Sequence, residues 1–125
     1  MDASALIKLL VKEQETDALS AFLSSPGHWL TSRVAAVEVP RALMRVGVTA
    51  AVDLATLWGS VSFRELDEEV VRRAASIEPA SVRALDAIHV ASALLARPEL
   101  DAFVTYDSRM ADAARLHGLP LVAPA

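Results

Sequence analysis

The alternation of apolar and polar residues along the chain predicts short strands separated by helices. Helical periodicity runs from Ser4 to about Glu15, and a second short helix follows from Thr16. The segment from Arg83 to Leu95 is apolar almost all round, which is typical of a buried helix. Further helices are predicted over residues 34–46 and 49–58, after Asp67, and from Asp107 or Ser108 to Gly118, and strands over residues 28–32, 61–65, 102–105 and 119–122.

Strands that alternate with helices favour an open parallel sheet with helices on both faces. We therefore predict an α/β fold, a three-layer α/β/α sandwich with a short parallel sheet. The 125 residues fit one domain, residues 1–125, that is long enough to bury a hydrophobic core.

Composition narrows the environments and partners that we expect. The formal net charge of −4 provides no overall basic field to attract nucleic acid, although a local basic patch is compatible with it. The absence of cysteine excludes disulfides and thiolate zinc sites and is compatible with a reducing cytoplasm. No apolar stretch approaches the ~20 residues of a membrane span, and no signal peptide is recognisable. The hydrophobic fraction of 54% is high for a small domain and hints at a homodimer or partner interface.

Asp86 is the one carboxylate within the apolar segment from Arg83 to Leu95. An aspartate is rarely buried unless it is paired or holds a metal ion. In open parallel sheets, ligands bind beyond the carboxyl ends of the strands. Asp2, Glu38 and Asp107 fall near those ends, and we expect them to meet Asp86 in one cleft.

Four carboxylates in one cleft repel one another unless divalent cations neutralise them. A site made only of oxygen ligands favours Mg²⁺ or Mn²⁺, and such ions activate water for in-line displacement at a phosphodiester. Spacing alone makes this arrangement suggestive, because each acid taken singly is better explained as a helix cap or a solvated residue.

Four blocks of sequence occur in an order that resembles a known family. They are Asp2-Ala-Ser-Ala, Ala36-Val-Glu38 before an Arg-Ala-Leu helix, Leu85-Asp-Ala-Ile-His-Val-Ala-Ser-Ala, and Val104-Thr-Tyr-Asp107 with His117-Gly118 downstream. Together they resemble the PIN-domain ribonucleases, specifically the VapC-type toxins of toxin–antitoxin pairs, over essentially the whole chain. The Leu-Asp-Ala-Ile-His-Val-Ala block with Thr-x-Asp downstream is the most specific part of the resemblance.

The resemblance implies a PIN-like fold and a metal-dependent endoribonuclease toxin that uses Mg²⁺ or Mn²⁺ to cleave RNA. It also implies a VapB-type antitoxin, whose C-terminal segment crosses an apolar groove and places a basic side chain near the acids. We expect a homodimer and a cytoplasmic location. The implied catalytic and metal-binding residues are Asp2, Glu38, Asp86 and Asp107, with the hydroxyls of Ser4 and Thr105 orienting carboxylates or a water on the metal.

Three further residues flank the predicted acidic site. Arg83 and Arg109 would either hold RNA phosphates or form salt bridges that keep the carboxylates apart. His89 follows Asp86 by one helical turn on the same face, and we interpret it as a packed histidine with a satisfied ring rather than as a catalytic group.

The chain departs from the family pattern at two places. In the family a short apolar strand precedes the first acid, whereas only Met1 does so here; we therefore expect a truncated first strand and a Met1 α-ammonium beside Asp2. Pro40 follows Glu38 by two residues, and a proline inside a helix removes a hydrogen bond. We therefore expect either a displaced Glu38 or a helix that starts late.

Other functions were weighed against the ribonuclease. A phospho-receiver domain needs a lysine near its last strand, and no lysine follows Lys12. A haloacid-dehalogenase-type phosphatase needs an acid where Ser4 stands, and a P-loop enzyme needs a glycine-rich loop that is absent here. The serious alternative is a catalytically impaired PIN-like module that binds RNA or protein.

Overall fold

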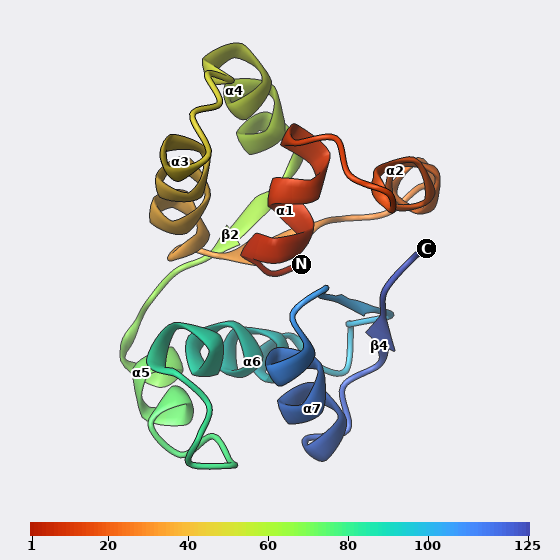
Figure 1. Cartoon of the computed structure of the whole chain (residues 1–125). Coiled ribbons are helices and arrows are strands. Elements are labelled where there is room, and N and C mark those ends of the chain that lie inside the picture. Colours follow the sequence, from red (N-terminus) through yellow and green to blue (C-terminus); the bar gives the residue numbers. More distant parts are fainter.

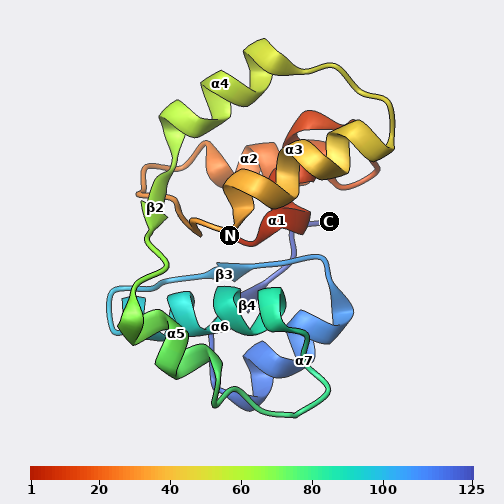
Figure 2. The same ribbon diagram turned by 90° about the vertical axis from the view of Figure 1, so that its left-hand side faces the viewer.

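Two layers of helices enclose the strands in the computed structural model, which describes residues 1–125 (Figures 1 and 2). One layer contains α1 (Ala3–Leu10), α2 (Thr16–Leu23), α3 (Ala35–Arg45) and α4 (Ala51–Ser60), and the other contains α5 (Glu68–Ala74), α6 (Ala84–Ala96) and α7 (Ser108–Leu116). Between them lie β1 (Leu30–Ser32), β2 (Ser62–Arg64), β3 (Phe103–Val104) and β4 (Leu121–Val122). The predicted α/β sandwich is confirmed.

The strands are parallel, as predicted, and the short sheet is divided into two pairs. β1 pairs with β2, and β3 pairs with β4. Met1 and Asp2 lie between the pairs, because the Met1 α-ammonium donates to Leu30 O at 2.7 Å and the Asp2 N–H donates to Val104 O at 3.2 Å. Met1 and Asp2 make one hydrogen bond to each pair and do not form a strand of their own. No strand precedes α1 within residues 1–125.

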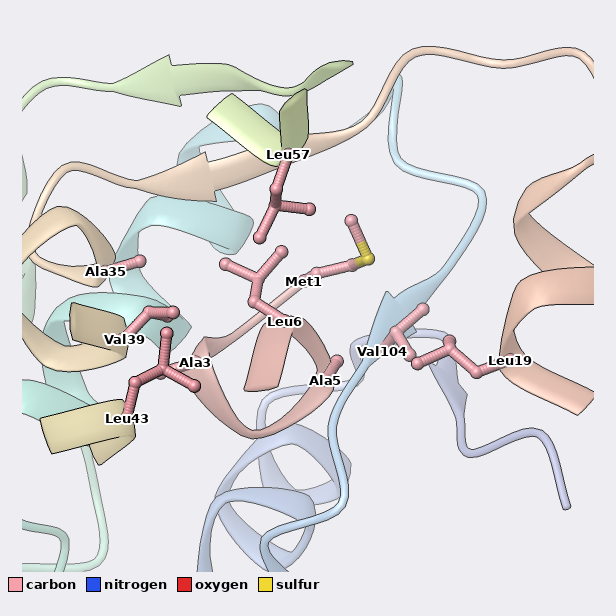
Figure 3. Packing of buried hydrophobic residues seen from close by; sticks show 10 residues of the cluster. All are labelled: Met1, Ala3, Ala5, Leu6, Leu19, Ala35, Val39, Leu43, Leu57 and Val104. Atoms are coloured by element: carbon pink, nitrogen blue, oxygen red, sulfur yellow. The ribbon is translucent and has the colours of Figure 1, made fainter. Parts of the chain in front are cut away.

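The strand layer separates two hydrophobic cores. The sides of β3 face different cores, with Val104 in one and Phe103 in the other, since successive side chains of a strand point to opposite faces. The N-terminal core comprises Met1, Ala3, Ala5, Leu6, Leu19, Ala35, Val39, Leu43, Leu57 and Val104 (Figure 3). The C-terminal core comprises Ile77, Ala87, Val90, Ala91, Ala93, Phe103, Met110, Ala113, Ala114 and Leu119.

Helix α1 ends at Leu10, five residues before the predicted end at Glu15. The Thr16 hydroxyl donates to Lys8 O at 2.9 Å and accepts the Glu13 N–H at 2.8 Å. The Lys8 ammonium also pairs with Glu13 and Glu15. These contacts turn the chain back and end the helix.

Helix α3 starts at Ala35 and continues through Pro40, so the expectation of a late start is wrong. Proline cannot donate the hydrogen bond of residue 40 and crowds the carbonyl four residues earlier, yet the helix continues to Arg45. The buried side chains of Ala35, Val39 and Leu43 are spaced by four residues and anchor one face of α3 in the N-terminal core.

Predicted helix ends based on local capping are confirmed. The Asp67 carboxylate accepts the Val70 N–H at the start of α5. Gly118 has φ of +69° immediately after α7, the left-handed conformation that favours glycine. By contrast, α4 runs through Gly59 to Ser60, although we predicted that Gly59 would close it. None of the helices combines the length and apolar character that a membrane span requires.

Candidate active site

The Asp2 carboxylate is held at the start of α1 by three hydrogen-bond donors. Its side chain caps the helix by accepting the Ala5 N–H at 3.1 Å. The Ser4 hydroxyl donates to Oδ1 at 2.7 Å, and the Thr105 hydroxyl donates to Oδ2 at 2.7 Å. Asp2 is only 1% exposed. A buried carboxylate with this many donors is fixed in one orientation.

The same two hydroxyls join α1 to the turn between β3 and α7. Ser4 Oγ accepts the Tyr106 N–H at 2.9 Å, and Thr105 Oγ1 accepts the Asp107 N–H at 3.1 Å. Each hydroxyl therefore accepts one backbone N–H and donates its hydrogen to Asp2. The structure thus places the two predicted orienting hydroxyls on Asp2, and their part in catalysis stays a prediction.

Asp107 caps α7, which also fixes the direction of its side chain. Oδ1 accepts the Arg109 N–H at 2.8 Å and the Met110 N–H at 3.0 Å. The helix start is thereby satisfied in the way that the sequence predicted. The other oxygen, Oδ2, lies 3.9 Å from the Arg83 guanidinium.

Arg83 connects Asp107 with Asp86, so one cation is shared by carboxylates from α7 and α6. Its Nε donates to Asp86 Oδ2 at 3.2 Å, and the Asp86 side chain is 11% exposed. Arg83 itself is 63% exposed. Of the two roles predicted for Arg83, the structure contains the salt bridge, and the RNA contact stays a prediction. The exposed Arg109 side chain forms no ion pair in the structure.

The Glu38 carboxylate bonds to His89 and shares no hydrogen-bond partner with the other acids. Glu38 Oε1 and His89 Nε2 are 2.6 Å apart, and His89 is buried. The interpretation of His89 as a packed histidine with a satisfied ring is confirmed, but the sequence did not identify its partner. The position of His89 one turn after Asp86 was the only signal that it faces the acidic site.

The Met1 α-ammonium lies next to Asp2 in sequence but donates its hydrogen bond to Leu30 O. Burial lowers its pKa to about 6, and the negative charge of Asp2 opposes this effect. A lowered pKa means that the folded chain disfavours the charged form of this amine.

The donor chemistry of the four acids fits a hard divalent cation, because carboxylate oxygens are the ligands that Mg²⁺ and Mn²⁺ prefer. Arg83 also shows that Asp86 and Asp107 can share positive charge. However, the structure contains no group of three acidic or histidine side chains close enough to share one ion. Asp2 is turned to its hydroxyls and Glu38 to His89. The four-acid site therefore stays a prediction.

An apolar cavity of about 660 Å³ lies between α5, the following loop and the start of α6. Leu66, Val71 and Ile77 line one part of it, and Val82 and Ile88 line the part next to Arg83 in sequence. The apolar groove implied by the sequence resemblance stays a prediction.

Comparison with known proteins gave matches over nearly the whole chain. A family model described as the PIN domain matches residues 1–116. Ribonuclease VapC46 of Mycobacterium tuberculosis is 36% identical over 124 residues, and Ribonuclease VapC47 of the same species is 38% identical over 129 residues. Ribonuclease VapC35 of that species is 35% identical over 128 residues. Each alignment covers 99% of this chain and 95% of the relative.

Proposed function

The chain belongs to the PIN-domain family, and from this premise we propose that it is an endoribonuclease toxin of a type II toxin–antitoxin pair. The observation that carries the proposal is the similarity to three proteins named Ribonuclease VapC over 99% of the chain. The acids at the starts of α1, α6 and α7 support it, because these parts of the chain adjoin the strands. Asp2 bonds to Val104 of β3, α6 contacts β1, and α7 contacts β4.

In this proposal Asp2, Glu38, Asp86 and Asp107 hold Mg²⁺ or Mn²⁺. When bound, such an ion would supply the Lewis acid that lowers the pKa of the attacking water and offsets charge on the phosphate. Asp2 is the fixed member of the set, because two hydroxyls hold it.

The two arginines have separate parts in the proposal. Arg83 neutralises the charges of Asp86 and Asp107 when no metal ion is bound. When a metal ion neutralises them, the exposed Arg83 side chain is free to turn to an RNA phosphate. Arg109 stands at the start of α7 without an ion pair and provides a second phosphate contact.

The proposed partners are RNA and a VapB-type antitoxin, and we place the pair in the cytoplasm. The apolar cavity beside the start of α6 supports an antitoxin whose apolar segment packs there and whose basic side chain reaches Asp86. We also propose a homodimer. Supporting it, Met44 on α3 and Val52 on α4 are 75% and 80% exposed and offer apolar surface to a second copy.

The test is cleavage of RNA by the purified chain with Mg²⁺ or Mn²⁺. We expect Asp86→Asn and Asp2→Asn to abolish cleavage and EDTA to do the same. Asp101→Asn is the matched control, because Asp101 is an exposed loop acid and its replacement should leave the rate unchanged. Cleavage that persists in EDTA, or in Asp86→Asn, would contradict the proposal.

A catalytically impaired module that binds RNA or protein is the second candidate. One observation favours it, namely that no three potential ligands lie together in the structure. If RNA binds to the purified chain but is not cleaved with either cation, this second function replaces the first.

A further inference from the structure

We propose that His89 is a positioning residue, which holds the Glu38 carboxylate beside the acidic site through its Nε2–H. This inference rests on the proposed function, since it assigns His89 a role only if Glu38 belongs to the site. A carboxylate only accepts hydrogen bonds, so the histidine nitrogen is the donor in the 2.6 Å contact. The neutral and the charged ring both supply such a donor.

The His89–Glu38 hydrogen bond crosses from one helical layer to the other. Glu38 lies on α3 and His89 lies on α6 (Figure 2). No other hydrogen bond joins these two helices. The position of the Glu38 carboxylate relative to α6 therefore depends on this one contact.

Glu38 has no second anchor of the kind that Asp2 and Asp107 possess. Asp2 accepts from two hydroxyls and Asp107 accepts from two backbone N–H groups, whereas Glu38 has only His89. Its side chain is 22% exposed. Because a glutamate side chain has more rotatable bonds than an aspartate, it loses more freedom when it is fixed and needs a partner to stay in place.

The His89 ring is well placed to act on Glu38 and Asp86 together. His89 follows Asp86 by three residues, which puts both side chains on one face of α6 about 5–6 Å apart at their Cβ atoms. A hydrogen bond from His89 to Glu38 therefore sets the distance of Glu38 from Asp86 through the rigid geometry of one helical turn.

The His89 ring is buried, with its side chain 2% exposed. Its neighbours beside a small cavity include Thr31, Ser92 and Phe103. Nε2 points to Glu38, so the buried ring holds the donor in this direction.

The test compares variants that keep or remove a donor at this point. His89→Gln retains an N–H near the position of Nε2. His89→Leu fills similar space without a donor. His89→Asn has a donor, but its side chain is too short to reach Glu38. Each variant is measured for RNA cleavage with Mn²⁺, for Mn²⁺ affinity by electron paramagnetic resonance, and for thermal unfolding without metal.

We expect His89→Leu and His89→Asn to lower kcat and Mn²⁺ affinity by about 10- to 100-fold, as is usual when a group that orients a metal ligand is lost. His89→Gln should restore both to within a few-fold, with KM unchanged. In a Glu38→Ala background, His89→Leu should cause no further loss of Mn²⁺ affinity, because the two side chains act through one contact. His89→Asn replaces His89→Leu in this comparison if the leucine variant does not fold.

The outcomes separate this inference from the proposed function. If the unaltered protein does not cleave RNA but its Mn²⁺ affinity depends on His89 as described, the proposed function fails and the positioning role stands. If RNA is cleaved with Mn²⁺ and His89→Leu and His89→Asn cleave it normally, the proposed function stands and the positioning role is overturned. Equal losses with and without Glu38, or no rescue by glutamine, also overturn it.

Discussion

Replacement of Thr105 by valine should destabilise the folded chain by about 2–4 kcal/mol. Valine has nearly the shape of threonine but has neither a donor nor an acceptor. Thr105 is 1% exposed, and its hydroxyl donates to Asp2 at 2.7 Å and accepts the Asp107 N–H at 3.1 Å. The substitution therefore breaks two contacts that join β3 to α1 and α7 without creating a cavity.

The magnitude follows from the two broken hydrogen bonds. A hydrogen bond to a charged group contributes about 1.5–3 kcal/mol, and a buried N–H left without an acceptor costs about 1–3 kcal/mol. The Asp107 N–H is partly buried, so its cost lies near the lower end. The extra methyl group offsets roughly 0.8 kcal/mol by its burial. The net loss is about 2–4 kcal/mol.

Thr105→Ser is the matched control, because serine keeps the hydroxyl and loses only the methyl group. Its cost should be about 0.5–1.5 kcal/mol, as for other losses of one buried methyl group. Both variants are measured by urea unfolding at neutral pH, with equal slopes as evidence that the same surface is exposed on unfolding. If valine costs no more than serine, the hydroxyl does not hold Asp2, and the account of this site is wrong.

Three further predictions address other parts of the molecule. Leu6→Ala should lower the free energy of unfolding in urea by about 2–5 kcal/mol, because Leu6 is fully buried in the N-terminal core. Val52→Ala, at an 80% exposed position, should change it by less than about 0.5 kcal/mol. Similar losses in the two variants would contradict the assigned core. Arg83→Gln should raise Mn²⁺ affinity about 1.5- to 5-fold in electron paramagnetic resonance titrations. The ion no longer has to displace the guanidinium from Asp86 and Asp107, and an exposed ion pair of this kind contributes roughly 0.2–1 kcal/mol. A weaker affinity would show that Arg83 does not compete with the ion. The hydrogen bond from Lys8 lowers the pKa of the Glu15 carboxyl below its ordinary value of 4.5. A carboxyl whose pKa is lower in the folded chain stabilises the fold at pH values above the ordinary pKa. This stabilisation is lost as the pH falls through the lowered pKa. Lys8→Met should therefore flatten the decline of Tm on acidification, and parallel curves would refute the pairing.

The elements that could be predicted from the sequence are those whose limits depend on near neighbours. Caps such as Asp67 and Asp107 act on N–H groups two or three residues away, so the pattern itself contains the interacting groups. The end of α1 depends on contacts of Lys8 with residues up to eight positions later, and periodicity does not register them. The split of the sheet depends on Met1 meeting Leu30, which lies 29 residues away.

The same limit separates the predicted from the unpredicted parts of the site. The residue types and their spacing identified Asp2 and Thr105 as candidates through resemblance, although their contact spans 103 residues. The partner of Glu38 was not predicted, because it depends on how α3 lies across α6. Neither helix contains that information in its own pattern. Glu38 and His89 are 51 positions apart in sequence, and three other elements lie between their helices.

The partners of the acidic side chains differ in how easily they can be displaced. Asp2 is buried, and its hydroxyl partner Thr105 is buried with it, so moving either would leave a polar group without a partner. Asp86 and Asp107 instead share the exposed guanidinium of Arg83, which loses little when it moves into water. We therefore expect the acids to gather around a cation by displacement of Arg83, with Asp2 as the fixed reference. This order explains how the folded chain can contain a cation site without three ligands already in contact.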